Sequence, residues 1–535
     1  MSKSHMTHQF SRVPKAEIQR SSFDRSLSRK QTFNSGFLVP VWCDEALPGD
    51  SFSLKMTAFA RLATPIFPLM DNMRMETFFF ATPNRLLWDN WEKFNGAQDN
   101  PGDSTDFIIP QMVSTAVTGY ESESLHDYLG LPTGIPDLTH SALWHRCYAL
   151  IVDEWFRDQN LQTRLSTETL TDDGPDDPVN YILMRRGKRH DYFTSALPWP
   201  QKGDSIPLPL GEQAPISGLG LTPTATFPLA SQQAKDSTGN NNTYDFAIGD
   251  AHDISSNFFM RGTGSDAGAL PDVYADLSQA TAATINELRQ AFQIQKMLER
   301  DARGGTRYTE ILKAHFRVTS PDARLQRPEY LGGGSSPVNI SPIAQTQATS
   351  DGVTPQGNLA AMGTATLHNH GFTKSFTEHC TLLGLISVRA DLTYQNGLDR
   401  MFSRQTRFDF FWPALAHLGE QTILNKEIYP QGSVDPIADE AVFGYQERFA
   451  EYRFSISKIC GKFKSNDPQS LDAWHLAQDF STLPTLSSTF IEDNPPISRV
   501  IAVQSEPEFL FDSHFQIRCA RPMPLYGVPG LIDHF

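Results

Sequence analysis

The most regular pattern of apolar and polar positions lies between residues 280 and 303. Its apolar side chains recur close to every 3.6 positions, at Ile285, Leu288, Phe292 and Met297–Leu298. This spacing predicts an amphipathic helix with one buried stripe, and the glycine pair at 304–305 supplies its stop. A single long helix among short apolar runs needs a sheet face against which to bury its stripe. We therefore expect a structural helix packed on a β-sandwich.

Most other apolar runs are short and bounded by proline, glycine or asparagine, which is typical of strands and turns. Phe52, Leu54 and Met56 alternate with polar neighbours, as on a half-buried strand. A shorter helix is predicted within residues 143–161. The runs predicted to contain strands are 39–62, 73–88, 373–394, 447–457 and 508–520. The chain is thus predicted to be mainly β.

Two long tracts lack clear periodicity. Residues 204–275 are rich in glycine, proline, serine, threonine and asparagine, and carry eight acidic against two basic residues. We interpret them as an exposed insertion with strand-like pieces such as 243–248; a disordered linker is the alternative. Residues 327–372 carry almost no charge. They are predicted to lie extended over another surface, such as a neighbouring subunit.

These patterns divide the chain into four segments. The segments are a partly extended basic arm (1–36), the first part of the core with its loops (37–203), a surface insertion (204–275) and the rest of the core (276–535). The last segment includes the helix at 280–303, an extended intersubunit loop at 320–372 and a proline-broken C-terminal tail.

The N-terminal segment differs from the rest of the chain in its positive charge. The whole chain has a formal net charge of −16, whereas residues 1–36 contain seven basic and two acidic residues, a local balance of +5. The basic residues are Lys3, Arg12, Lys15, Arg20, Arg25, Arg29 and Lys30. A basic, serine-rich arm with interspersed phenylalanines favours contact with nucleic-acid phosphates and bases. A disordered or partner-embracing arm, made soluble by its charge, is the equally weighted alternative.

Composition excludes several classes of protein. The five cysteines are scattered without a C-x-x-C pair, which indicates reduced thiols and neither a disulfide framework nor a zinc ribbon. The longest apolar run is too short to span a bilayer, and no secretory signal is evident, so we expect no membrane insertion.

No candidate catalytic or metal centre outweighs a structural explanation. His368 and His370 alternate, so on a regular strand both would face one side, as two metal ligands might. The glycine run at 332–334 lacks the lysine of a phosphate loop. Residues 172–177 lack the ligand pattern of a calcium loop and are interpreted as a solvated acidic turn. We expect no cofactor, no metal and no enzymatic activity.

Six blocks of sequence, taken together, are more informative than any single motif. They are VPVWCDEALPGDSF (39–52), RMETFFFATPNRLLW (74–88), YFTSALPWPQKGD (192–204), ATINELRQAFQIQKMLERDARGGTRYTEIL (283–312), RPEYLGGGSSPVNISPIAQT (327–346) and the terminal MPLYGVPGLIDHF. In this order, over most of the chain, they resemble the major capsid protein of gokushovirus-type microviruses, which are small tailless single-stranded DNA bacteriophages. The resemblance is weakest across 204–275.

The resemblance implies an eight-stranded antiparallel jelly roll with long inserted loops and a few helices. It implies that identical subunits assemble into a T=1 icosahedral shell around a circular single-stranded DNA genome. It places the protein in the virion, and in the host cytoplasm during assembly. The insertion at 204–275 would form a protrusion at the threefold axes.

The resemblance also implies partners. These are other copies of the chain, the packaged DNA, a small basic DNA-binding protein, a minor pilot protein and a host cell-surface receptor. The basic arm would face the interior. Residues of the insertion expected to face a receptor are Asn240, Asn241, Asn242, Tyr244 and Asp245; stabilisation of a trimer is the alternative role for this segment.

Two other classes compete with the capsid interpretation. A β-sandwich that binds or cleaves carbohydrate would need an aromatic cleft with two carboxylates at catalytic separation. A cupin-like metal enzyme would use His368 and His370. The carbohydrate-protein class gives the basic arm and the long neutral tract no obvious role.

Overall fold

The structure is a computed structural model that divides into two compact units. It describes residues 19–165, 171–204, 206, 216–217, 220–221, 233–235, 243–245, 274–275, 285–305, 308–317, 326–349 and 355–526. One unit comprises Met1–Pro200 with Thr319–Phe535, and the other comprises Gln201–Val318. The two units are described separately below.

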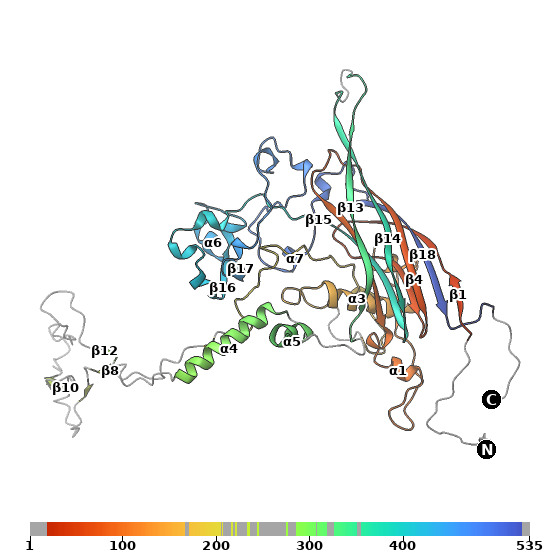
Figure 1. Ribbon diagram of the computed structural model, residues 1–535, viewed down its shortest axis with the longest axis horizontal. Helices are drawn as coiled ribbons and strands as arrows, with labels where there is room; N and C mark the ends of the chain where they lie inside the picture. Colours follow the sequence, from red (N-terminus) through yellow and green to blue (C-terminus); the bar gives the residue numbers. More distant parts are fainter. Residues whose placement is uncertain are drawn as a thin grey trace, which may run out of the picture. The chain divides into compact units, whose positions relative to one another are not determined.

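The first unit is built on two antiparallel sheets that share one continuous strand order (Figure 1). The first sheet runs β1/β2–β18–β4–β14, and the second runs β13–β5–β15–β3. The strands of the first sheet are β1 (Ser21–Asp24), β2 (Leu27–Phe33), β18 (Phe509–Arg521), β4 (Ser51–Leu62) and β14 (Leu359–Ser375). Those of the second are β13 (Glu329–Ala344), β5 (Met73–Pro83), β15 (Cys380–Ala390) and β3 (Val39–Ala46).

This strand order is that of a jelly roll. Along the chain, the strands alternate between the two sheets, except that β5 and β13 follow one another in the second sheet. The first sheet thus receives β4, β14 and β18, and the second receives β3, β5, β13 and β15. β1 and β2 act as one interrupted strand, because both pair with β18. With those two counted together, the described strands of the sandwich number eight, as in a jelly roll. The predicted fold class is confirmed.

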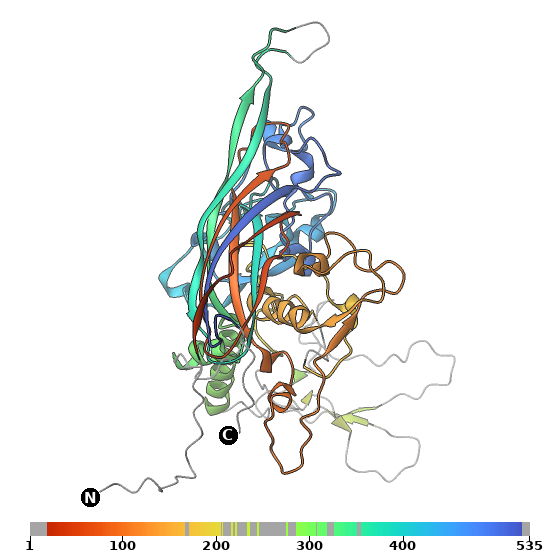
Figure 2. The same ribbon diagram turned by 90° about the vertical axis from the view of Figure 1, so that its right-hand side faces the viewer.

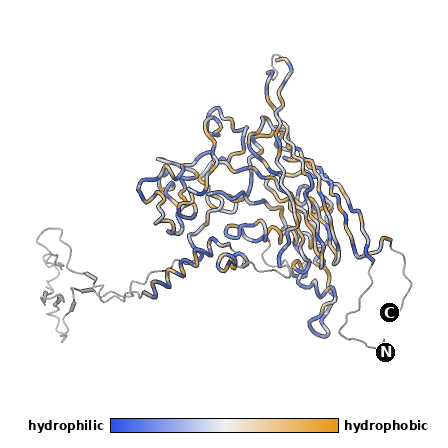
Figure 3. Tube along the Cα trace, viewed as in Figure 1, coloured by the Kyte–Doolittle hydropathy of each residue, from blue (hydrophilic) through white to orange (hydrophobic). Residues whose placement is uncertain are grey.

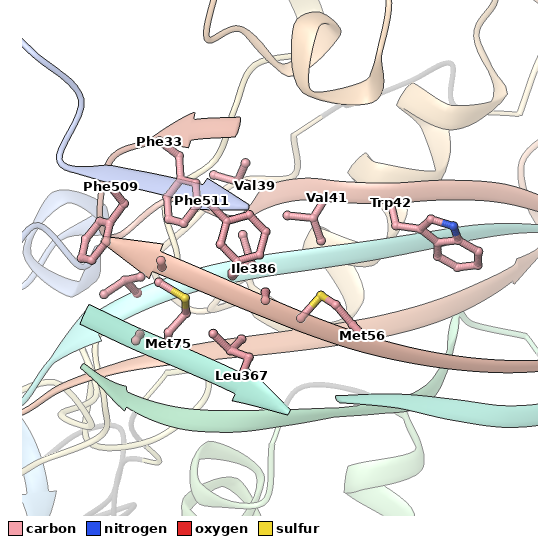
Figure 4. Packing of buried hydrophobic residues seen from close by; sticks show 14 of the residues in the cluster. Phe33, Val39, Val41, Trp42, Met56, Met75, Leu367, Ile386, Phe509 and Phe511 are labelled. Carbon is pink, nitrogen blue, oxygen red and sulfur yellow. The ribbon is translucent and has the colours of Figure 1, made fainter. Parts of the chain in front are cut away.

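Alternation along the strands explains the core. In β4 every second side chain, from Phe52 to Leu62, is buried while the intervening ones are exposed or half-buried. Figure 3 shows that hydrophobic and hydrophilic residues are interspersed along the strands of this unit. The buried side chains of both sheets meet between the sheets (Figure 4). There the rings of Phe33 and Phe509 stack at 5.7 Å. Aromatic pairs of this kind add to the free energy gained from burial alone.

The predicted intersubunit loop at 320–372 is in large part a strand hairpin. Residues 329–338 of β13 pair with β5, residues 364–375 of β14 pair with β4, and only 339–344 and 359–364 pair with each other. The far end of this hairpin extends beyond the neighbouring strands (Figure 2). The prediction of a loop is therefore wrong for β13 and β14. It failed because glycine, serine and proline hide the alternation.

Close backbone packing accounts for the glycines of β13. A Cβ atom on Gly333 would lie 2.0 Å from the carbonyl oxygen of Thr77 on β5, and one on Gly334 would lie 2.5 Å from the His370 ring. Glycine in a strand interior often marks such a close approach. The run at 332–334 is thus explained by the contact between the strands.

We expect Gly333→Ala to lower the free energy of unfolding by about 1–3 kcal/mol, the usual cost of overpacking. The added methyl group must displace strand backbone rather than a flexible side-chain end. Chemical denaturation of the subunit measures the change. Ser341→Ala, at an exposed position of the same strand, is the control. Equal stability of both variants and wild type would show that β13 and β5 are further apart than described.

Two long connections carry the remaining elements of this unit. The connection after β5 contains α1 (Trp91–Phe94), β6 (Gln111–Val113), α2 (Leu125–Leu129), β7 (Thr139–Ser141) and α3 (Leu143–Ile151), which a π-helical turn (Val152–Phe156) extends. The connection before β18 contains β16 (Glu420–Leu424), α6 (Pro436–Glu440), β17 (Val442–Glu447) and α7 (Ser488–Ile491). The helix predicted within 143–161 is confirmed. The strand predicted at 447–457 is wrong, because β17 ends at Glu447 and a short 3-10 helix follows.

The two sheets differ in what covers their outer faces. Cys147, Tyr148 and Ile151 of α3 pack with Leu383 and Leu385 of β15, so apolar helix residues cover part of the second sheet. On the first sheet, the side chains of β4 and β18 opposite the core are exposed or half-buried. This difference makes the outer face of the first sheet a candidate binding surface.

The second unit contains the predicted long helix as α4 (Ile285–Arg303), followed by α5 (Tyr308–Phe316). The helix is confirmed, but burial of its stripe is not, since Leu288, Phe292 and Met297 are 37–61% exposed among the described residues. His315 Nε2 of α5 donates a 2.7 Å hydrogen bond to the carboxylate of Asp301 on α4. The described pieces of the insertion are β8 (Ile216–Ser217), β9 (Gly220–Leu221), β10 (Gln233–Lys235), β11 (Thr243–Asp245) and β12 (Tyr274–Ala275).

Candidate nucleic-acid interface

The outer face of the first sheet concentrates exposed cations. On β4, the positions between the buried ones are exposed from Lys55 to Arg61 and include Phe59, whose side chain is 50% exposed. The neighbouring β18 adds the exposed Arg518, and β2 adds the exposed Lys30. We call this surface the cationic sheet face and define it by a set of exposed residues from β1, β2, β4 and β18. The residues are Asp24, Lys30, Lys55, Thr57, Phe59, Arg61, Leu510, Asp512, His514, Gln516 and Arg518.

Strand register places these side chains side by side. Leu510 lies opposite Arg61, Asp512 opposite Phe59, and His514 opposite Thr57. Lys30 lies opposite Asp512 on the other side of β18 and forms a 2.8 Å ion pair with it. The face therefore presents four cations against two carboxylates, in a chain whose formal net charge is −16.

A groove of about 560 Å³ lies along this surface. Its lining includes Phe59, Arg61, Lys30 and Leu510, together with Tyr128 near the edge strand. The ring of Phe59 and the side chain of Leu510, which is 53% exposed, give it an apolar floor beside cationic groups. Aromatic rings beside cations are the combination that binds single-stranded nucleic acid by stacking and phosphate contact.

Some of the predicted arm residues already have partners within the chain. Arg20 donates a 2.8 Å hydrogen bond to Ser51, and Arg25 forms a 2.7 Å ion pair with Asp44. Arg29 is partly buried and donates to the backbone oxygen of Tyr128 at 2.6 Å; burial lowers the pKa of its guanidinium. Lys30 belongs to the cationic sheet face. Lys3, Arg12 and Lys15 lie outside the described residues.

The sequence prediction missed Lys55, Phe59, Arg61 and Arg518. A signal was present, because an inward-facing Phe52, Leu54 and Met56 place the intervening residues on the opposite face of the strand. The prediction gave weight to the density of charge along the chain instead. In a sheet, cations from β2, β4 and β18 gather on one face although they are far apart in sequence.

The residues predicted to face a receptor are only partly described. Tyr244 and Asp245 lie in β11, which pairs antiparallel with β10. Asn240, Asn241 and Asn242 lie outside the described residues. The role of all five residues stays a prediction.

The two candidate metal-binding histidines do not share a side. The pairing of β14 with β4 shifts between Leu367 and His370, and Asn369 has a φ of 58°, so a bulge separates the pair. His368 is exposed, whereas His370 is buried and hydrogen-bonds to Thr77 at 2.9 Å and to Ser336 at 3.3 Å. Burial lowers the pKa of His370. His370 thus acts as a structural link between β14, β5 and β13.

The acidic segment at 172–177 is more than a solvated turn. Asp176 and Asp172 bind the guanidinium of Arg146, whose side chain is fully buried. Asp173 accepts a hydrogen bond from the indole of Trp88 at 2.6 Å. The carboxylates of the segment at 172–177 therefore anchor α3 to the residues that follow β5. Among the described residues, no group of three or more histidine, cysteine or acidic side chains has a geometry that could hold a metal ion.

Comparison with known proteins agrees with the fold and with the resemblance in sequence. The capsid protein (F protein) family matches residues 11–531. The chain is 48% identical to the capsid protein VP1 of Bdellovibrio phage phiMH2K over 540 residues, covering 99% of each chain. It is 43% identical to the capsid protein VP1 of Chlamydia phage 1 (98% of each chain), and 34% identical to that of Spiroplasma virus 4 (98% of this chain, 97% of the relative). Within the described residues, no helix combines the length and apolar character needed to cross a bilayer. The chain therefore belongs to the capsid protein (F protein) family, as a major capsid protein of the gokushovirus type.

Proposed function

We propose that this capsid protein assembles into a T=1 icosahedral shell that encloses a circular single-stranded DNA genome. The observation that carries the proposal is a jelly-roll sandwich in a chain matched over residues 11–531 by a capsid family. Two packed sheets form a rigid block, and the long connections after β5 and before β18 supply contact surfaces. The protein would act in the virion and assemble in the host cytoplasm.

The cationic sheet face is the part of the subunit best suited to lie against the genome. Lys55 and Arg61 are exposed, and neither has an ion-pair partner among the described residues. Phe59 lies between them on the same face, where its ring is available for stacking with a base. The arm residues Lys3, Arg12 and Lys15 would extend the same interface. Because the chain as a whole is acidic, a small basic DNA-binding protein would supply further neutralisation.

The insertion at 204–275 would form the threefold protrusion and contact a host cell-surface receptor. Its excess of acidic residues supports an outward rather than a genome-facing position, because DNA phosphates repel like charges. Asn240, Asn241, Asn242, Tyr244 and Asp245 would be presented there. A minor pilot protein would be a further component of the particle.

Removal of two cations from the cationic sheet face should weaken binding of single-stranded DNA. For Lys55→Gln combined with Arg61→Gln, the slope of log affinity against log salt should flatten by about 1.4, since each phosphate contact contributes about 0.7 for single strands. Fluorescence anisotropy with a labelled oligonucleotide measures this slope. The control is Arg289→Gln with Lys296→Gln, which removes two exposed cations from α4. An unchanged slope in the first variant, or an equal change in the control, would contradict this placement of the DNA.

Assembly itself is tested by expressing the protein with and without its partner proteins and examining it by sedimentation and negative-stain microscopy. Uniform icosahedral particles, or subassemblies that convert to them, are expected. A stable monomer under every condition would contradict the proposal.

A further inference from the structure

The connection before β18 exposes an unusual concentration of aromatic side chains. Five lie between residues 402 and 412, and the sixth follows β17. We call this group the aromatic face. Its members and their exposed fractions are Phe402 (69%), Phe408 (61%), Phe410 (49%), Phe411 (46%), Trp412 (47%) and Tyr452 (51%).

The aromatic face is fixed in place rather than carried on an unsupported loop. The ring of Phe411 packs edge-on against Phe449 at 5.4 Å, and Phe449 is only 3% exposed. The indole of Trp412 donates to the backbone oxygen of Arg407 at 3.0 Å. Asp409 accepts hydrogen bonds from the hydroxyl and the backbone N–H of Thr406, which closes the turn between them. A partner would therefore meet a surface that needs little ordering on binding.

The size of this surface is typical of an interface. A large aromatic side chain has about 150–250 Å² of surface, so the exposed fractions of these six leave roughly 600 Å² uncovered. The largest apolar patch on a monomeric protein is about 300–600 Å². A standard interface buries about 800 Å² on each partner. The six side chains alone account for most of that area.

Charge compensation favours a protein partner over nucleic acid. Arg404 pairs with Glu451 at 3.2 Å, and Arg400 pairs with Glu427 at 3.0 Å. Lys458 likewise pairs with Asp399 at 2.6 Å. Few cations are thus left to neutralise phosphates, and nucleic-acid affinity depends mainly on such neutralisation.

Two arginines of this surface lie over aromatic rings, as in the centre of protein interfaces. Arg407 lies over the rings of Phe408 and Trp412, at 5.7 and 5.2 Å from their centroids. Arg404 lies over Tyr452 at 4.4 Å. Arginine with tryptophan, tyrosine and phenylalanine is the composition enriched at interface cores and at the residues that dominate binding energy.

We propose that the aromatic face is a subunit–subunit contact of the shell, covered by a second copy of this chain. This proposal rests on the proposed function, because only a multi-subunit assembly provides that copy in every particle. Phe408 and Trp412 are expected to contribute most, since both are large, exposed and joined by Arg407. The contact would be an assembly determinant separate from the cationic sheet face.

The test compares assembly by wild type, Phe408→Ser with Trp412→Ser, and Phe408→Leu with Trp412→Phe. The serine variant should fold, with a near-wild-type circular dichroism spectrum, but need at least about tenfold more protein to form particles. The leucine–phenylalanine variant keeps apolar area and should assemble close to wild type. Phe316→Ser, at a phenylalanine that is 71% exposed on α5, is the control and should form particles normally.

The outcomes separate this inference from the proposed function. Failure of wild type to assemble would remove the proposed shell. Normal assembly by the serine variant, with wild-type particles present, would overturn only the role of the aromatic face. Normal assembly with loss of oligonucleotide binding would assign the surface to nucleic acid and also overturn the inference.

Discussion

Replacing Asp176 by alanine is expected to lower the free energy of unfolding of the subunit by about 3–5 kcal/mol. Arg146 of α3 is 0% exposed at its side chain, and Asp176 is 5% exposed. The two form a bidentate pair, with Arg146 Nε donating to Asp176 at 2.8 Å. Without this carboxylate, the guanidinium would remain buried with only part of its charge compensated. Leaving one charge of a buried pair without its partner lowers stability far more than losing an ion pair on the surface.

Asp172→Ala is the matched control for this prediction. Asp172 contacts the same guanidinium at 3.0 Å, but its side chain is 48% exposed, so its loss should cost about 1 kcal/mol or less. Urea denaturation of both variants, followed by circular dichroism, gives the two values. Similar losses for both would mean that Arg146 is reached by solvent and that the turn at 172–177 is not its anchor.

The subunit should also lose about 3 kcal/mol of stability as the pH falls from 6.5 towards 4. A cluster of three histidines between α2, β7 and α3, of which His126 and His145 are buried, is responsible. His126 Nδ1 lies 2.8 Å from His145 Nε2, so one ring donates a hydrogen bond to the other. The ring of Tyr120 stacks on His126 at 3.9 Å, and its hydroxyl lies 2.7 Å from His140. Burial, with repulsion from His140, lowers the pKa of His126 to about 4, and burial holds the pKa of His145 well below its usual value.

The direction of this pH dependence follows from the number of protons that the folded and unfolded chains bind. An unfolded histidine titrates near a pKa of about 6.5, so below that pH the unfolded chain binds protons that the folded cluster excludes. The stabilisation is fully present above pH 6.5 and decreases as the pH falls towards the folded-state pKa of His126, about 4. Denaturation at a series of pH values measures it. His126→Phe, which preserves the stack on Tyr120, should flatten the profile, whereas His417→Gln at an exposed position should not. Parallel profiles for wild type and His126→Phe would contradict the assignment.

The elements that could be predicted from the sequence are those in which the spacing of apolar residues within one segment marks a helix or a strand. Alternation identified β4, the apolar runs at 73–88 and 373–394 contain β5 and β15, and the 3.6-residue period identified α4. It failed at β13 and β14, where glycine and serine fit close strand contacts without marking an inner and an outer face. It also failed for the pair His368 and His370, because a bulge in β14 reverses the simple alternation.

The candidate site was predictable only in part, for the same reason. Lys30 was identified from the charge of the arm, and Lys55 and Arg61 follow from alternation along one strand. Their assembly with Arg518 depends on pairing between β4 and the C-terminal β18, which is a contact between distant parts of the chain. Likewise, no local sequence pattern marks the pairing of the buried Arg146 with Asp176. The aromatic run at 402–412 is visible in the sequence, but its exposure is a property of the fold.

The most direct test of the account is a cryo-electron microscopy reconstruction of DNA-filled particles made from this chain and its partner proteins. The account predicts a T=1 shell of jelly-roll subunits in which the cationic sheet face lines the interior, with density beside Phe59, and the aromatic face is covered by a neighbouring copy. A shell with the cationic sheet face on its outer surface, or a protein that forms no closed particle, would contradict it.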